Sequence, residues 1–207
     1  MEKLKELVIE GDNKETVERI ELLLKEGKNP EDIVKNALIP AMDKVGDLFS
    51  AKEYFIPDLL ISARAMEEGM AILKPLLSSG DKIESKGKFV LGTVKGDLHD
   101  IGKTLVECII NAAGFEVIDL GIDLPPEKFV EAIKEHNPVA IGLSALLTIT
   151  MIEMKEVIDA ITKAGLRDKV KILLGGAPVS QAYADEIGAD FFGPDPGAAK
   201  NYLLTII

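Results

Sequence analysis

The chain has 207 residues, of which 47% are hydrophobic and 29% are charged, so a soluble globular protein of one or two domains is expected. A net charge of −11 and an aromatic content of 5% without tryptophan argue against nucleic acid, anionic membranes and stacked bases as partners. The lack of a long apolar run and of an N-terminal signal pattern, together with a single cysteine, favours a cytoplasmic protein.

Residues 1–78 show helical periodicity throughout. Pro40 falls inside one of the periodic segments and should kink it, because proline lacks an amide hydrogen and its ring clashes with the preceding turn. Because four helices are expected, a four-helix bundle is predicted. The expected helices cover residues 2–9, a segment capped by Asn13 and ending at Gly27, a segment starting at Pro30, and a segment starting near Pro57.

A change of composition separates this helical part from the rest of the chain. Residues 79–87, with the sequence SGDKIESKG, are polar and contain glycine and serine, as linkers do. The sequence therefore predicts a helical domain over residues 1–78, a linker over residues 79–87 and a second domain over residues 88–207.

From Lys88 onwards, short apolar runs alternate with helical stretches in five βα units. The strand runs lack strict alternation, as is typical of parallel strands that are covered on both faces. Right-handed crossovers would join them into a five-stranded, parallel, doubly wound sheet. A flavodoxin-like (Rossmann-like) fold with strand order 2-1-3-4-5 is predicted.

The residues that suggest chemistry follow the predicted strands. Doubly wound sheets bind ligands beyond the carboxyl ends of their strands, where the strand order switches, here between the first and the third strand. Three segments should meet there: GDLHDIG after the first strand, SALLTIT after the third and GGAP after the fourth. The candidate ligand-binding residues in them are Gly96, Asp97, Leu98, His99, Asp100, Ile101, Gly102, Ser144, Leu146, Thr148, Gly175 and Gly176.

Asp97 and His99 are close enough in sequence for a carboxylate to orient an imidazole. Such a contact fixes the tautomer and leaves the second ring nitrogen for a metal. Gly102 and the pair Gly175-Gly176 would let a bulky ligand approach the backbone. A hydrolytic metal site would need about three protein ligands, so a lone histidine suits a metal that arrives inside a large cofactor.

Each of these features also has a simpler interpretation. A histidine at a strand end is usually solvated or hydrogen-bonded, and a glycine pair after a strand is usually a turn. Ser144 could cap the next helix, whereas as part of a ligand site it would offer, with Thr148, a hydroxyl to a polar group.

The pattern Asp97-x-His99-x-x-Gly102, followed by Ser144-x-Leu146 and Gly175-Gly176, resembles the cobalamin-binding domain of methionine synthase and of corrinoid methyltransferase proteins. The resemblance implies that His99 replaces the nucleotide base beneath cobalt, in the base-off/His-on form, and that the base tail enters the sheet crevice. It also implies a relay from His99 through Asp97 to a hydroxyl, where Thr150 stands in place of the usual serine.

The N-terminal part resembles the helical cap of the same family. The matching residues are Met42-x-x-Val45-Gly46-x-x-Phe49, then Phe55-Ile56-Pro57 and Ser62-Ala63-x-Ala65-Met66. The resemblance implies that Phe49 and Ile56 cover the upper face of cobalt, that Met42 and Val45 also belong to the cofactor-binding residues, and that a hinge near residues 79–87 lets the cap move. Without the resemblance, Phe49, Ile56 and Met66 would be interpreted as bundle core.

The function that the resemblance implies is methyl transfer by a carrier, a methyltransferase component that is not a complete catalyst alone. A cobalamin or related corrinoid would alternate between Co(I) and methyl-Co(III) (methylcobalamin). The implied partners are a substrate-specific methyltransferase, an acceptor methyltransferase that uses tetrahydrofolate or a thiol, and a reductive activator. The alternatives are a cobalamin sensor or storage module, and the cobalamin subunit of a carbon-skeleton mutase.

Overall fold

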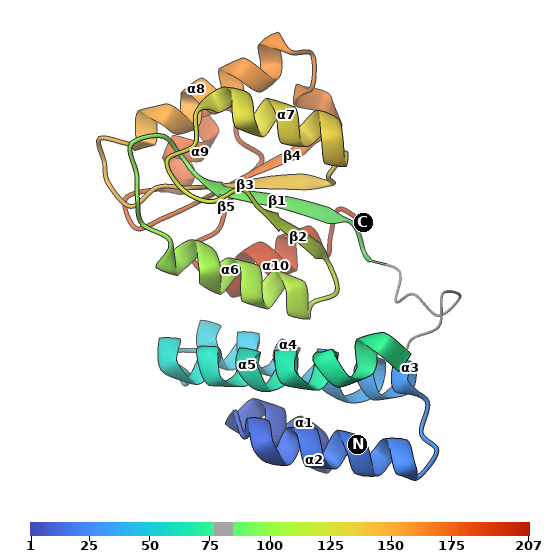
Figure 1. Cartoon of the computed structure of the whole chain (residues 1–207). Coiled ribbons are helices and arrows are strands. Elements are labelled where there is room, and N and C mark those ends of the chain that lie inside the picture. The colour runs from blue at the N-terminus through green and yellow to red at the C-terminus, as the bar shows by residue number, and fades with distance from the viewer. Residues whose placement is uncertain (77–84) are drawn as a thin grey trace. The chain divides into compact units, whose positions relative to one another are not determined.

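The computed structural model describes residues 1–76 and 85–207, which form two compact units (Figure 1). One unit lies within Met1–Ser85 and also includes Asn111–Gly114, and the other comprises Lys86–Ile110 and Phe115–Ile207. All but the last three residues of the predicted linker and hinge, residues 79–87, lie outside the described residues. Within residues 1–76 and 85–207, no helix combines the length and the apolar content that a bilayer-spanning segment needs.

The first unit is a bundle of the four predicted helices. Its helix α2 is capped by Asp12 rather than by Asn13, because the Asp12 carboxylate accepts the N–H of Glu15. Its core contains the fully buried side chains of Leu4, Ile20, Leu38, Leu59 and Leu73. The elements are α1 (Glu2–Glu10), α2 (Asn13–Lys25), α3 (Pro30–Ile33), the π-helix η1 (Val34–Leu38), α4 (Ile39–Ser50), α5 (Ile56–Leu73) and the 3₁₀ turn η2 (Lys74–Leu76).

Pro40 lies in the first turn of α4, directly after the π-helix η1. A proline removes one backbone donor, and its ring needs more room than an α-helical turn provides. A π turn is wider than an α turn and meets both requirements. The disturbance expected at Pro40 therefore takes the form of a change of helix type within one continuous helical segment.

The second unit is a parallel sheet with the predicted strand order, β2-β1-β3-β4-β5. Helices α6 and α10 cover one face of the sheet, and α7, α8 and α9 cover the other (Figure 1). The strands are β1 (Lys88–Thr93), β2 (Glu116–Asp119), β3 (Ala140–Ser144), β4 (Lys171–Gly175) and β5 (Phe191–Phe192). The helices are α6 (Ile101–Ala112), α7 (Pro126–His136), α8 (Met151–Lys163), α9 (Gln181–Ile187) and α10 (Pro196–Leu203), with a 3₁₀ turn η3 (Arg167–Lys169) before β4.

The register of the sheet determines where its loops leave it. Thr93 at the end of β1 pairs with Ser144 at the end of β3, and Ser144 pairs in turn with Gly175 at the end of β4. Apolar side chains such as Val90, Ile141 and Ile172 are fully buried between the sheet and its helices. The three strands therefore end at one level, from which three loops start side by side.

Candidate functional site

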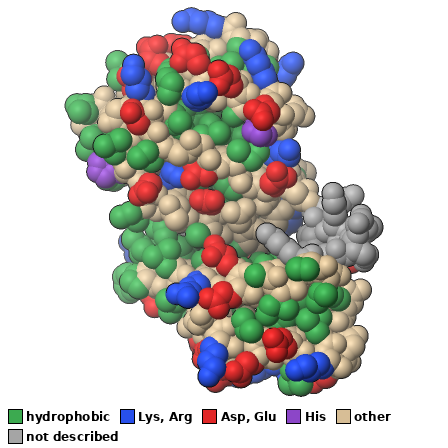
Figure 2. All heavy atoms as spheres, in the orientation of Figure 1, with side chains coloured by type: hydrophobic (Ala, Val, Ile, Leu, Met, Phe, Trp, Pro, Cys, Tyr) green, Lys and Arg blue, Asp and Glu red, His purple; other side chains and the backbone are tan. Residues whose placement is uncertain are grey.

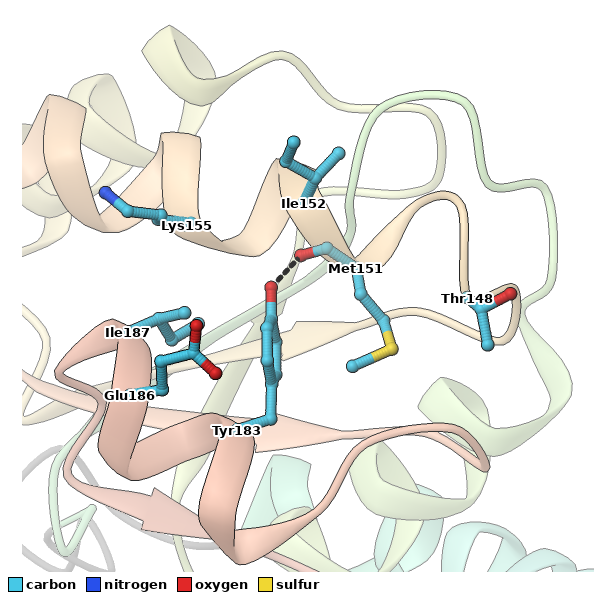
Figure 3. Close-up of a pocket in the computed structure, with 7 residues that line it drawn as sticks. All are labelled: Thr148, Met151, Ile152, Lys155, Tyr183, Glu186 and Ile187. Atoms are coloured by element: carbon cyan, nitrogen blue, oxygen red, sulfur yellow. Dashed lines mark hydrogen bonds between the residues drawn. The ribbon is translucent and has the colours of Figure 1, made fainter.

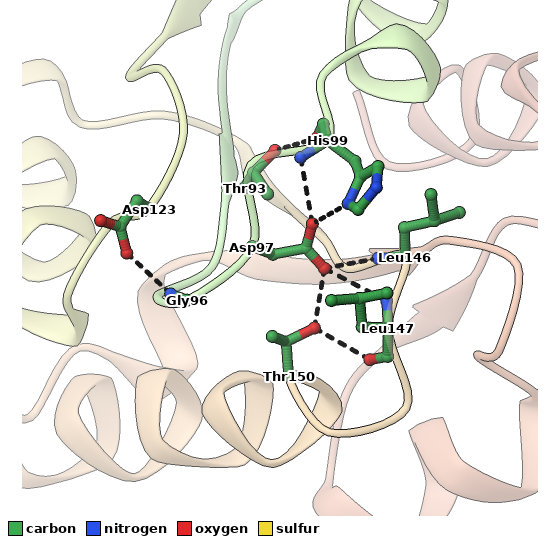
Figure 4. Close-up of polar contacts among 8 residues, drawn as sticks. All are labelled: Thr93, Gly96, Asp97, His99, Asp123, Leu146, Leu147 and Thr150. Carbon is green, nitrogen blue, oxygen red and sulfur yellow. Dashed lines mark hydrogen bonds and ion pairs between the residues drawn. The ribbon is translucent and has the colours of Figure 1, made fainter.

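Asp97 lies at the centre of the loops that follow β1 and β3 (Figure 4). Its side chain is fully buried, and Oδ1 accepts the N–H of His99 at 3.1 Å and lies 2.7 Å from Nδ1 of the same residue. Oδ2 accepts the N–H groups of Leu146 at 2.8 Å and Leu147 at 3.2 Å, and the hydroxyl of Thr150 lies at 2.7 Å. One carboxylate thus connects the β1–α6 loop with the β3–α8 loop.

These contacts determine the charge of Asp97 and the tautomer of His99. Burial alone would raise the pKa of the Asp97 carboxyl, but the hydrogen bonds from Thr150, from the His99 ring and from the backbone lower this pKa well below its ordinary range. An ionised carboxylate can only accept hydrogen bonds, so Nδ1 of His99 carries the hydrogen. Nε2 is then the nitrogen available to a metal, on a side chain that is 50% exposed.

Thr150, the relay residue implied by the resemblance, lies in contact with Asp97 and is 5% exposed. Its Oγ1 is also 2.8 Å from the carbonyl oxygen of Leu147. Both neighbours are acceptors, so the single hydroxyl hydrogen is shared between them or directed at the charged oxygen. The methyl group that distinguishes threonine from serine is therefore compatible with the contact to Asp97.

The glycines predicted to admit a ligand differ in their surroundings. Apart from its two chain neighbours and the nearby backbone of its own helix, no atom of the described residues lies within 4 Å of the place where Gly102 would carry a Cβ. At Gly175 the nearest atom beyond the chain neighbours is the carbonyl oxygen of Gly193, 3.9 Å away. A Cβ on Gly176 would lie 1.8 Å from the carbonyl oxygen of Ala145, and this residue has φ of +129°. Gly176 is therefore required by the fold, whereas the packing of the described residues requires neither Gly102 nor Gly175.

Comparison with known proteins identifies the family. A family model described as "B12 binding domain" matches residues 87–203, and a second model with the same description matches residues 1–74. A corrinoid protein of Desulfitobacterium hafniense is 44% identical over 92% of this chain and 89% of its own. Dimethylamine corrinoid protein 1 of Methanosarcina mazei is 42% identical over 84% of this chain and 81% of its own.

The chain belongs to the family of B12-binding corrinoid proteins. The resemblance inferred from the sequence motifs is thereby confirmed, and the expected cofactor, cobalamin or a related corrinoid, is that of the family. The fold is also similar to the methanol:cobalamin methyltransferase complex from Methanosarcina barkeri, with a TM-score of 0.88 and 32% identity over 98% of this chain and 77% of that chain.

The geometry of this corrinoid protein fits such a cofactor. A metal held inside a large cofactor would need few ligands from the protein, and the oriented imidazole of His99 could supply one. The open space at Gly102 would admit a bulky group, and at Gly175 a Cβ would make only one ordinary van der Waals contact, to the carbonyl oxygen of Gly193. The His99 imidazole and the space beside Gly102 would therefore both suit a metal that is held inside a large cofactor.

Exposed apolar side chains accompany His99. Leu98 and Ile101 are 66% and 67% exposed, and Leu146 is 43% exposed. Apolar side chains also reach the surface among charges of both signs in Figure 2. Exposed leucine and isoleucine next to a candidate ligand are typical of a surface that an apolar group covers.

The remaining predicted residues of the loops have local roles as well. The carbonyl oxygen of Asp100 accepts the N–H of Thr104 and so begins α6. Ser144 does not cap the next helix, because α8 starts only at Met151; its carbonyl oxygen instead accepts the N–H of Val94. Ser144 is the last residue of β3, and Gly96 lies in the turn that follows β1.

Thr148 lines a surface hollow of about 370 Å³ between α8 and α9 (Figure 3). There, the hydroxyl of Tyr183 donates to the carbonyl oxygen of Met151 at 2.5 Å, which ties α9 to the start of α8. Burial raises the pKa of the Tyr183 hydroxyl, so this donor keeps its proton at neutral pH. Thr148 therefore lies at this hollow, and no hydrogen bond joins its side chain to the residues drawn in Figure 4 among those that the structure describes. The other residues of the hollow are Ile152, Lys155, Glu186 and Ile187.

The predicted cap residues belong to the first unit and differ in exposure. Met42 and Val45 are 2% and 0% exposed and pack in the core of that unit. Phe49 is half-buried, and Ile56 is 41% exposed, so these two have surface that a ligand could contact. The role of all four toward the cofactor stays a prediction.

Sequence reasoning missed residues around the β2–α7 loop. Thr93 donates its hydroxyl to the carbonyl oxygen of His99 at 3.0 Å, and Asp123 accepts the N–H of Gly96 at 2.7 Å. Lys103 and Asp119 form an ion pair in which the lysine side chain is only 3% exposed. A signal was available, because Asp119 lies near the end of the second predicted strand and Asp123 follows that strand as Asp97 follows the first, but no ligand segment was expected after the edge strand β2.

Proposed function

We propose that this corrinoid protein is a methyl carrier that binds cobalamin or a related corrinoid base-off, with His99 as the lower ligand of cobalt. The observation that carries the proposal is the buried, ionised Asp97 carboxylate, which holds a hydrogen on Nδ1 of His99 and leaves Nε2 for the metal. When bound, the corrinoid supplies the cobalt chemistry of accepting and releasing a methyl group.

The chain's own residues would hold and shield that group. Asp97 orients the imidazole, and Thr150 supports Asp97 from the opposite side. Gly102 and Gly175 leave room for the cofactor beside the strand ends, and Leu98 and Ile101 would keep water from its apolar rim. Residues 1–78 would serve as a cap whose Phe49 and Ile56 cover the reactive face.

The partners follow from the carrier role. Relatives of this chain are named dimethylamine and trimethylamine corrinoid proteins, and the similar structure is a methanol:cobalamin methyltransferase complex. A substrate-specific methyltransferase would load the methyl group, an acceptor methyltransferase using tetrahydrofolate or a thiol would remove it, and a reductive activator would restore the cofactor after stray oxidation.

The ligand assignment is tested by reconstitution with hydroxocobalamin, followed by absorption and Co(II) EPR spectroscopy. Wild type should bind one corrinoid per chain, with nitrogen superhyperfine coupling from the protein. His99→Ala should lose that coupling. His136→Ala is the matched control: His136 ends α7, and Figure 2 shows the two histidines at separate places on the surface. Retained coupling in His99→Ala, or its loss in His136→Ala, would show that the ligand is another group.

The carrier role is tested with an isotopically labelled methyl donor. The reduced, reconstituted protein should acquire label only when a cognate methyltransferase and its donor are both present. A sensor or storage module would acquire none. A mutase subunit would instead support a rearrangement with adenosylcobalamin, and either result would refute the carrier.

A further inference from the structure

Asp123 makes two hydrogen bonds to the turn that carries the candidate ligand, and Figure 4 shows the one from its carboxylate. Its Oδ1 accepts the N–H of Gly96 at 2.7 Å, and its own N–H donates to the carbonyl oxygen of Asp97 at 3.1 Å. The two groups lie at opposite ends of the Gly96–Asp97 dipeptide. A residue of the β2–α7 loop therefore holds both ends of the peptide segment that precedes His99.

The backbone of Asp123 is adapted to this double contact. Its φ is +54°, in the left-handed region that few residues other than glycine, asparagine and aspartate adopt readily. Gly96, its partner, also has a positive φ of +78°. Both sides of the contact therefore use a backbone conformation that most side chains would oppose, and a carboxylate is one of the few side chains that satisfies both requirements at position 123.

The loop that carries Asp123 is anchored on both sides. Before it, the buried ammonium of Lys103 pairs with Asp119, whose Oδ1 accepts the N–H of Gly121 at 2.9 Å. The carbonyl oxygen of Gly121 accepts the N–H of Thr93 at 3.0 Å, and after it the N–H of Leu124 donates to the carbonyl oxygen of Thr93 at 3.1 Å. The loop is therefore a fixed support and can impose its position on the turn.

The opposite side of Asp97 is equally constrained, because its carboxylate reaches Leu146, Leu147 and Thr150 at once. A small displacement of the Asp97 main chain must therefore change the distance from Oδ1 to the His99 ring. We propose that Asp123 is a positioning residue that sets the place and tautomer of the His99 imidazole through the Gly96–Asp97 backbone. Applied to the cobalt ligand, this rests on the function proposed above.

Three substitutions distinguish the effect of the Asp123 carboxylate from the effect of its left-handed backbone conformation. Asp123→Gly keeps the left-handed backbone and removes the acceptor. Asp123→Asn keeps both, because asparagine tolerates this conformation and its Oδ1 can accept the N–H of Gly96. Asp123→Ala removes both. The matched control is Asn137→Ala, which also places alanine at a positive φ, here +47°. Asn137 ends α7 and precedes β3, so it lies near the amino ends of the strands, away from the loops of the site.

The first measurements use the protein without corrinoid. In Asp123→Gly, amide exchange at Gly96 should accelerate about tenfold, as expected for the loss of a charge-assisted hydrogen bond. Long-range ¹H–¹⁵N NMR should show that the Nδ1–H tautomer of His99 is less populated. Asp123→Asn should restore both properties, and Asn137→Ala should lower the melting temperature without changing either one.

The second measurements use hydroxocobalamin. Asp123→Gly should bind it roughly tenfold more weakly, as for other groups that orient a metal ligand, with reduced nitrogen coupling in the Co(II) EPR spectrum. If Gly96 exchange, the His99 tautomer and corrinoid affinity all stay at wild-type values in Asp123→Gly and Asp123→Ala, the positioning role is refuted. If wild type binds no corrinoid while the exchange and tautomer effects occur, the proposed function fails and the positioning role stands.

Discussion

At the scale of single residues, the site distinguishes side chains that the fold needs from side chains that only a ligand would need. Gly176 is needed by the fold, since a Cβ there would overlap the backbone of Ala145. Gly102 is not, because it lies in the first turn of α6, where glycine lowers helix stability and no described atom occupies the adjacent space. A glycine that costs stability without a packing reason points to something outside the chain.

Substitution by alanine should therefore have opposite effects on the free energy of unfolding at Gly102 and at Gly176. Gly102→Ala should stabilise the protein without corrinoid by about 0.5 kcal/mol or more, and Gly102→Val should weaken hydroxocobalamin binding at least about tenfold by filling the space a macrocycle would use. Gly176→Ala should destabilise the protein by more than about 2 kcal/mol. Urea unfolding and corrinoid titration measure both quantities. Unchanged affinity in Gly102→Val would mean that the open space is not part of the cofactor site.

Thr150 carries a second prediction at this scale. Thr150→Val keeps the shape of the side chain and removes the hydroxyl that supports Asp97, so the free energy of unfolding should fall by about 1.5–3 kcal/mol. Thr150→Ser keeps the hydroxyl and should stay within about 0.5 kcal/mol of wild type. Equal stability of the valine and serine variants, measured by urea unfolding, would show that the hydroxyl does not support the carboxylate.

At the scale of elements, an ion pair fastens helix α6 to the end of strand β2. The Lys103 side chain is 3% exposed, whereas the Asp119 side chain is 28% exposed, so the lysine loses more hydration than its partner. A buried ammonium without a partner is far more costly than a buried methylene chain. The two residues should therefore respond unequally to substitution.

Asp119→Ala should destabilise the protein by about 2–3 kcal/mol, because it leaves the Lys103 ammonium without its carboxylate. Lys103→Met should cost less, since the methionine retains the packing of the stem and carries no charge. The double variant should recover most of the loss caused by Asp119→Ala. Thermal unfolding of the four proteins forms a double-mutant cycle, and additive effects would show that the pair is not coupled.

The elements also show what the sequence could and could not reveal. Apolar runs without alternation predicted a parallel sheet, and the rules for strand connections led to the observed order. The π-helix η1 and the turn η3 were not predicted, because each depends on how neighbouring turns share their hydrogen bonds. Asp97 and His99 were found because they lie only two residues apart in sequence. The contact from Asp123 was missed because it joins positions 27 residues apart.

At the scale of the whole molecule, the proposed function predicts which sequence segments respond to corrinoid. The predicted cofactor-binding residues extend from Met42 to Gly176, although neighbouring segments serve only local packing. Helix α1, for example, contributes Leu4, Leu7 and Val8 to the core of the first unit. Corrinoid binding should therefore protect some segments of the chain from hydrogen exchange more than others.

Hydrogen exchange detected by mass spectrometry tests this selectivity. Corrinoid at a hundredfold excess over its Kd should add about 2.7 kcal/mol of stability. Peptides containing Asp97 to Gly102 and Ser144 to Thr150 should gain protection, as should those containing Phe49 and Ile56, while α1 should change least. Protection of the loops without the peptides around Phe49 and Ile56 would contradict the proposed cap.

The common level at which β1, β3 and β4 end also governs how the chain tolerates changes in length. Thr93, Ser144 and Gly175 stay aligned only while each strand keeps its residue count, and one extra residue inside β3 would turn its side chains to the opposite faces. The connections that enter the strands, such as residues 164–170, lie at the other edge of the sheet and carry none of the aligned groups. This can be tested with a library of single-residue insertions that is sorted for corrinoid binding. Insertions inside the strands should abolish binding, whereas insertions in the connections that enter the strands at their amino ends should be tolerated.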